Sequence, residues 1–424
     1  MAQSIDSRAL NTSQESERAA ASLWKLRLLA GWTVLFASLV GLFAVIWDIQ
    51  WHAAVGRDRT LTAPHLFILG SATLLGITAL AAVLIETGWA RRSALVAKSG
   101  TAFAGFFSSS VGAYLVGYGA LATAIAFPID QYWHTLYGID VAVWAPFHVM
   151  GLTGFSVCCL GVACTLVEGA HLAAQQGAKG AARAGYSSAV VAFAVLMGFL
   201  SILLPEALRT GYISLGSLTF TVYPLMLGAF GTFVLMAARR ALPWRWTATC
   251  VALIYAIFGL LSYLLVPPLM TWLLRVEQQN LLQGAATVPV LALTWQYPLV
   301  IAALLLDGVT WLARSRGWSA RRRKRATLVA ASVGMTLVAL FSPFIFSSQF
   351  LISTQRRAFA ADRVAGATGE FAAHAGKAVQ GAPTGLNMIV VVIVVASLLL
   401  GLFGVYVGNR LGAGIGELMQ RKEQ

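Results

Sequence analysis

Long apolar stretches alternate with short polar connections along almost the whole chain. Ten of these stretches contain few charges, and each is long enough to cross about 30 Å of hydrocarbon as an α-helix. The predicted spans cover residues 24–51, 64–89, 103–133, 146–172, 186–207, 217–238, 244–271, 289–313, 326–348 and 386–409. The pattern therefore predicts an all-α polytopic membrane protein with about ten transmembrane helices.

The polar segments between the spans divide the chain. Residues 1–23 are polar and rich in Ser and Ala, so we expect a disordered N-terminus and no signal peptide. Residues 24–175 contain the first four spans, 186–313 add further membrane helices, and 326–424 hold the last ones. A long polar loop at 351–385 separates the final two spans.

The composition agrees with a membrane protein. Charged residues make up 11% of the chain, whereas a soluble protein carries roughly a quarter. The net charge of +14 does not indicate nucleic-acid binding, because the basic residues form short clusters between apolar stretches. Four cysteines inside the spans argue against both a disulfide framework and a CxxC metal site. They are Cys158, Cys159, Cys164 and Cys250.

Basic residues cluster in every second connection. By the positive-inside rule, this alternation places both termini in the cytoplasm and the 351–385 loop outside. The even number of predicted spans agrees, so we expect a multi-pass protein of a bacterial-type inner membrane. The basic residues concerned are Arg91, Arg92, Lys98, Lys179, Arg183, Arg239, Arg240, Arg245 and those from Arg314 to Arg325.

A polar pattern occurs twice at the predicted outer ends of the first four spans. Residues 47–65 read WDIQWHAAVGRDRTLTAPH, and residues 129–148 read IDQYWHTLYGIDVAVWAPFH. We interpret the first two spans as a duplicate of the next two, running in the same direction. The pairs 82 positions apart are Asp48 with Asp130, His52 with His134, Asp58 with Asp140 and Glu86 with Glu168; His65 and His148 are 83 apart.

Each copy has the residue types of a metal site. An Asp and a His lie one helical turn apart, and a second His follows a Pro that suits the first turn of the next helix. A single set of this kind is explained by polar side chains that lie among the lipid headgroups. Because the set occurs twice, we favour a metal ion that keeps coordination positions open for water, O₂ or substrate. Copper, non-haem iron and zinc all suit these ligands. The predicted ligands are Asp48, His52, His65, Asp130, His134 and His148, with Asp58 and Asp140 as candidates that orient the histidines.

The first copy resembles the C subunit of the particulate methane monooxygenase and ammonia monooxygenase family, the copper membrane monooxygenases. The similar pattern is Asp48-x3-His52, followed by Arg57-Asp58, then a Thr at position 62 and the final His at position 65. The family has a Glu three residues after that His, whereas this chain has Ile68.

The second copy, Asp130-x3-His134-x13-His148, resembles the neighbouring copper site of the same subunit. The family has Asn where this chain has Asp130. The resemblance covers residues 24–175. The C-terminal half is extra, and the sequence carries no cupredoxin-like domain.

The resemblance implies two adjacent copper sites and an enzyme, a copper-dependent monooxygenase or oxidase that uses O₂ on a small apolar substrate. All six ligands would then be catalytic. A quinol is a candidate electron donor, and partner subunits or a homo-oligomer are expected in the bilayer. Two alternatives stay open: a non-haem iron membrane oxygenase, and a copper or other metal transporter with Cys158, Cys159 and Cys164 on its path.

Other polar and aromatic residues have simpler interpretations. Glu86 and Glu168 lie about 30 Å from the last histidine of their copy and cannot join the metal sites. We expect structural roles for the Glu168–His171 pair and for His374, whereas Asp307 inside a span is a functional candidate. Some aromatic residues beside the ligands belong to an interfacial belt or wall a substrate pocket. They are Trp47, Trp51, Tyr132, Trp133, Tyr137 and Trp144.

Overall fold

The computed structural model describes residues 2–55, 61–137, 143–209, 212–215, 218–281, 296–347 and 388–421. Within these ranges the chain forms eleven helices and two short antiparallel β-hairpins. The helices are α1 (Ala2–Val55), α2 (Ala63–Ala90), α3 (Ala94–Ser99), α4 (Val111–Tyr137), α5 (Pro146–Gln175), α6 (Lys179–Arg209), α7 (Tyr223–Ala241), α8 (Thr247–Val276), α9 (Gln296–Ser315), α10 (Ala320–Ser347) and α13 (Met388–Arg421). The hairpins pair β1 (Thr101–Phe103) with β2 (Phe107–Ser109), and β3 (Tyr212–Leu215) with β4 (Leu218–Thr221).

Nine of the described helices are long and apolar enough to cross a membrane, which confirms the predicted class. They are α1, α2, α4, α5, α6, α8, α9, α10 and α13. The helix α7 is not among them, although the sequence predicts a span at 217–238. Its 19 residues extend about 28 Å, so it is nearly as long as the hydrocarbon is thick.

Two predicted spans begin too early, because a β-hairpin precedes the helix in each case. The span predicted at 103–133 starts within β1 and β2, and its helix begins at Val111. The span predicted at 217–238 includes β4, and its helix begins at Tyr223. Apolar β-branched and aromatic residues extend a hydropathy window while favouring strands. At the N-terminus, α1 begins at Ala2, ahead of its apolar segment Ala21–His52.

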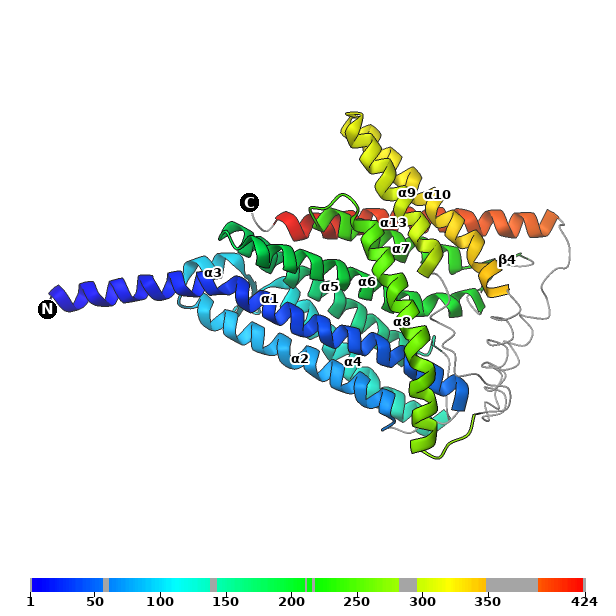
Figure 1. The fold of residues 1–424 in the computed structure, drawn as a ribbon, viewed down its shortest axis with the longest axis horizontal. Coiled ribbons are helices and arrows are strands. Elements are labelled where there is room, and N and C mark those ends of the chain that lie inside the picture. The colour runs from blue at the N-terminus through cyan, green and yellow to red at the C-terminus, as the bar shows by residue number, and fades with distance from the viewer. Residues whose placement is uncertain are drawn as a thin grey trace.

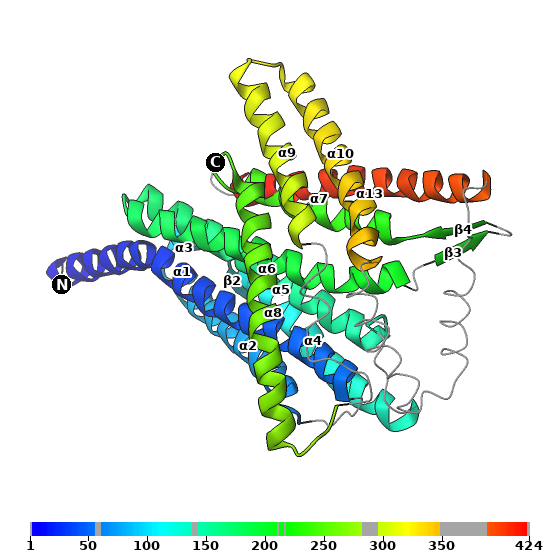
Figure 2. The ribbon, with the colours of Figure 1, turned by 45° about the vertical axis from the view of Figure 1, so that its right-hand side comes forward.

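The first four membrane helices form two hairpins that lie side by side (Figures 1 and 2). α1 packs against α2 and α5, and α4 packs against α2 and α5. At the α4–α5 contact, a Cβ on Gly119 or Gly154 would collide with the backbone of the facing helix. Small residues allow this close approach. The arrangement brings the ends of α1 and α4 and the starts of α2 and α5 to the same end of the unit.

The last helix, α13, runs along α7 with direct backbone contact. Gly404, Gly408 and Gly412 recur at every fourth residue, and a Cβ on each would collide with the backbone of α7. This spacing keeps the three glycines on one helix face. Because lipid and apolar side chains are equally apolar, the close packing itself holds the two helices together.

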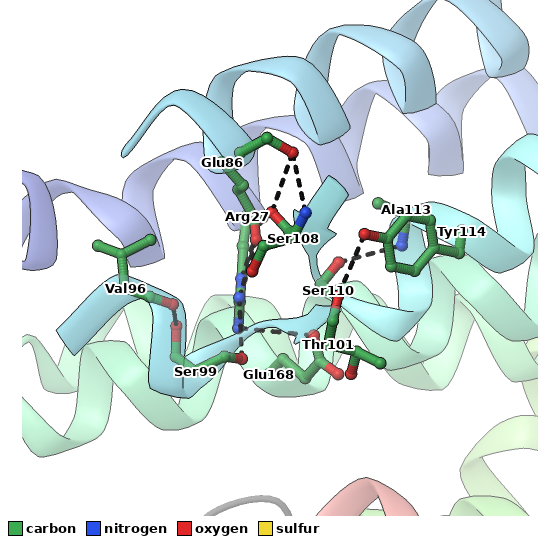
Figure 3. Close-up of polar contacts among 11 residues, drawn as sticks. Arg27, Glu86, Val96, Ser99, Thr101, Ser108, Ser110, Ala113, Tyr114 and Glu168 are labelled. Carbon is green, nitrogen blue, oxygen red and sulfur yellow. Dashed lines mark hydrogen bonds and ion pairs between the residues drawn. The ribbon is translucent and has the colours of Figure 1, made fainter. Parts of the chain in front are cut away.

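A buried ion cluster joins α1, α2 and α5 at the end opposite the predicted metal ligands (Figure 3). Arg27 Nε donates to Glu86 Oε1 at 3.2 Å, and Nη2 donates to Oε2 at 2.9 Å. Arg27 Nη1 also lies 3.6 Å from Glu168 Oε2. One guanidinium therefore contacts both glutamates of the repeated sequence pattern. This supports the structural interpretation of Glu86 and Glu168.

A second buried cluster explains Asp307 on α9, which is fully buried. Arg239 Nε of α7 lies 2.7 Å from Asp307 Oδ1. The backbone N and the hydroxyl of Thr249 donate to Oδ2 at 2.8 and 3.0 Å. Helix α8 begins after Trp246, which makes no side-chain cap bond, so Asp307 caps α8 from a neighbouring helix. Removing this carboxylate would leave the Arg239 guanidinium without its ion-pair partner. It would lower the free energy of unfolding by about 3–5 kcal/mol.

We predict that Gly408→Ala lowers the melting temperature, because its new Cβ would meet the backbone of Ala229 and Phe233. Overpacking of this kind costs roughly 1–3 kcal/mol. Gly414→Ala on the same helix is the matched control, since a Cβ there meets open space. Thermal unfolding in detergent measures both variants. Equal melting temperatures for the two would contradict the close contact between α7 and α13.

Candidate metal centre

The first predicted ligand set comes together at the junction of α1 and α2. Asp48 and His52 lie one turn apart near the end of α1, and His65 lies in the first turn of α2. His65 Nε2 is 3.2 Å from Asp48 Oδ1, and His52 Nε2 is 3.6 Å from Asp48 Oδ2. One donor atom from each residue lies within 4.8 Å of the others, so the group could hold a metal ion.

The start of α2 is held by its own sequence. Thr62 is the N-cap, and its hydroxyl accepts a hydrogen bond from the His65 backbone N at 3.4 Å. Pro64 occupies the first turn, where its fixed φ suits a helix and its missing N–H is not needed. Thr62 is 1% exposed, so the cap is shielded from competing solvent. The cap therefore fixes the backbone that carries His65.

The second predicted set forms at the junction of α4 and α5. His134 Nε2 and His148 Nε2 lie 3.2 and 3.3 Å from the same atom, Asp130 Oδ1. In the first set, by contrast, the two histidines approach different oxygens of Asp48. Among the described residues, the second set does not bring all three donors within 4.8 Å of one another.

The two sets also differ in exposure. The side chain of His65 is 8% exposed, whereas that of His148 is 34% exposed. The N-cap of α5 is Ala145, which makes no side-chain cap bond, so the second copy lacks the counterpart of Thr62. The first set is therefore the more enclosed and the more firmly positioned.

Aromatic rings lie between and around the two sets. The His65 ring is 5.9 Å from Phe127, one turn before Asp130 on α4, which makes the sets neighbours. Phe147 lies 6.1 Å from His134 and 4.6 Å from His148. The sequence interpretation missed both phenylalanines, although Phe127 and Asp130 share a helix face by their spacing.

The predicted aromatic belt divides into two groups. Tyr132 and Trp144 are exposed, as expected at an interface, whereas Trp47 and Trp51 are 3% and 1% exposed. Trp47 packs beside Phe67 of α2, with 6.1 Å between the ring centroids. The two buried tryptophans thus belong to the core around the first set. The Tyr137 side chain lies outside the described residues.

In the first set, the donor atoms could share one cation. Asp48 Oδ1 and Asp130 Oδ1 are buried, and among the described residues imidazole nitrogens lie within 3.3 Å of each. A buried carboxylate is costly unless a positive charge lies beside it. Two imidazoles and one carboxylate supply three ligands and leave coordination positions open.

Some residues that the sequence analysis singles out are not described at the two sets. Asp58, Asp140 and His374 lie outside the described residues. Cys158 and Cys159 are fully buried, and Cys158 Sγ donates to the Val116 carbonyl at 3.3 Å, so the Cys158 thiol packs at the α4–α5 contact. His171 lies at the other end of α5 from His148.

A small recess borders α1 on the side away from Asp48. Ile46 and Leu42 of α1, Ser201 of α6 and Tyr255 of α8 line it, and the Tyr255 hydroxyl donates to Ser201 Oγ at 2.6 Å. Ile46 and Asp48 are 200° apart around the helix, so the recess does not open onto the ligands. It marks where the later helices pack on the first four.

Comparisons of the chain with protein-family models, curated proteins and solved structures find no match. The chemistry assigned to the two ligand sets therefore depends on the sequence pattern and on the geometry described above.

We predict that Thr62→Val weakens metal binding by the first set about fivefold, because an N-cap contributes roughly 1 kcal/mol. Thr62→Ser retains the hydroxyl and is expected to bind like the parent. Both changes are made in a His134→Ala background, so that the first set is measured alone. Competition with a chromophoric chelator gives the affinity. Identical affinities for the Val and Ser variants would contradict a positioning role for Thr62.

Proposed function

We propose that this protein is a copper-dependent membrane monooxygenase or oxidase that uses O₂ on a small apolar substrate. The observation that carries the proposal is the convergence of Asp48, His52 and His65, from two helices, on one group of donor atoms. The spacing of both ligand sets, which resembles the copper membrane monooxygenases, favours copper over iron or zinc.

In this proposal the first four helices are a parallel duplicate in which each copy holds one ion. Asp48, His52 and His65 would hold one copper, and Asp130, His134 and His148 the other. Copper with two imidazoles and one carboxylate keeps open positions for activating O₂. Asp130 adds a full negative charge where the related family has an amide, which strengthens the second set as a cation site.

The protein's own residues would position and shield the reacting groups. Thr62 fixes the backbone of His65, while Phe127 and Phe147 place apolar rings beside the histidines. Such walls suit an apolar substrate and limit water. Hydroxylation consumes one O₂, two electrons and two protons, and it yields the hydroxylated substrate and one water. A two-electron donor such as a quinol is therefore required.

Metal transport is the main rival function. A transport path needs ligands that continue through the membrane, whereas both ligand sets lie at one end of the helices. Cys158 and Cys159, which a transport path would use, are packed in the core. The geometry therefore favours a fixed site over a path.

We predict about two copper ions per chain in the wild type and about one in His52→Ala or in His134→Ala. O₂ consumption with a quinol donor should fall in both variants, because each loses an imidazole ligand. Copper content by mass spectrometry and O₂ consumption with an electrode are measured on the same samples. His171→Ala is the control, since His171 lies far from both sets.

Two outcomes would remove the proposal. One is a wild type without stoichiometric copper. The other is full copper and full activity in both histidine variants. Copper uptake by cells that is lost in a Cys-free variant would instead favour transport.

We further propose that both termini face the cytoplasm and that the ligand sets lie near the outer face, in a bacterial-type inner membrane. In a Cys-free background, Asp58→Cys should react with an impermeant thiol reagent in intact cells, because the α1–α2 connection would lie outside. Arg92→Cys, between α2 and α3, is the matched control and should react only after lysis. The reverse pattern would invert the orientation.

A further inference from the structure

The connection between α9 and α10 carries an unusual density of positive charge. The apolar segments Pro298–Ser315 and Ala320–Phe341 are separated by four residues. Around this turn lie seven of the chain's 30 Lys and Arg residues, with no Asp or Glu among them. We call this group the basic turn; it consists of Arg314, Arg316, Arg321, Arg322, Arg323, Lys324 and Arg325.

Elsewhere in the described ranges, buried Arg side chains have carboxylate partners. Arg27 and Arg239, which are buried, each contact a carboxylate. In the described parts of the chain, the basic turn forms no ion pair with Asp or Glu. The Arg322 guanidinium lies over the ring of Trp318, 4.2 Å from its centroid. Six of the seven side chains belong to exposed residues, and Arg323 is half-buried.

The N-terminus of α10 adds to the positive potential of the basic turn. Ser319 precedes α10, and its hydroxyl accepts a hydrogen bond from the Arg322 backbone N at 3.4 Å. The first turn of α10 therefore carries several cations and no acidic residue. A helix N-terminus has a partial positive charge of its own, so like charges accumulate there. An external anion would relieve this repulsion.

The position of the basic turn relative to the hydrocarbon indicates which anions it meets. A four-residue link between two apolar helices keeps the cations at the edge of the hydrocarbon. There they meet lipid headgroups. The tip of the α9–α10 hairpin stands clear of the other described helices in both ribbon views (Figures 1 and 2). Orienting a helix pair in the membrane requires fewer cations than this, since the other basic connections named above contain only two or three.

We propose that the basic turn binds the phosphates of anionic membrane lipids. Arginine forms bidentate hydrogen bonds with phosphate, and six of the seven residues are arginines. Trp318 suits the same level of the membrane, because its ring is apolar and its indole N–H is polar. The proposal concerns a surface outside the metal ligands and does not depend on the proposed oxygenase activity.

Native mass spectrometry with added phosphatidylglycerol or phosphatidylcholine tests this directly. The variant replaces Arg321, Arg322, Arg323, Lys324 and Arg325 by Gln. Wild type should retain phosphatidylglycerol at least about tenfold more tightly than this variant, with phosphatidylcholine binding unchanged. A second variant with the four arginines changed to Lys keeps the charge and should retain most of the binding. Arg91→Gln/Arg92→Gln/Lys98→Gln, in another basic connection, is the matched control and should bind like wild type.

Equal phosphatidylglycerol binding by wild type and the Gln variant would overturn the proposal. So would equal losses in the Gln variant and the matched control, which would indicate a general effect of net charge. Inorganic phosphate is added as a competitor in a separate series. If it displaces the lipid at comparable concentration, the turn is a general anion site and the lipid proposal fails. Melting curves of all variants identify any that do not fold.

Discussion

A carboxylate inside a membrane protein is stable only beside a positive charge, and this constraint organises the helix bundle. At one end, Arg27 holds Glu86 of α2 and approaches Glu168 of α5, which ties the two hairpins together. Farther along the chain, Arg239 pairs with Asp307 while Thr249 donates to the same carboxylate. The contacts join α1 to α2 and α5, and α9 to α7 and α8. These polar contacts therefore help to hold the neighbouring helices together.

At the other end of the first four helices, buried carboxylates lie beside histidines. Within the described ranges, the close partners of Asp48 and Asp130 are imidazoles. A neutral imidazole cannot balance a buried carboxylate. In the proposed function, a metal ion would supply the missing positive charge and leave both imidazoles neutral, as ligation requires. Charge balance therefore supports the metal proposal, as does the spacing of the residues.

The sequence was sufficient for those features that depend on local periodicity. Apolar length predicted nine membrane helices that the structure describes, and the spacing of Asp, His and Pro predicted that each Asp would lie beside its two histidines. It failed where structure depends on contacts across the fold. Nothing local shows that Asp307 caps α8. The hairpins before α4 and α7 were also missed, because hydropathy does not distinguish an apolar strand from the start of a helix.

The central claim is that the carboxylate and the two histidines of the first set share one metal ion. A structure determined with copper present, using anomalous scattering at the copper edge, tests it most directly. The account predicts an anomalous peak roughly 2 Å from nitrogens of His52 and His65 and from an oxygen of Asp48. No peak there, with the imidazoles hydrogen-bonded directly to the carboxylate, would contradict it.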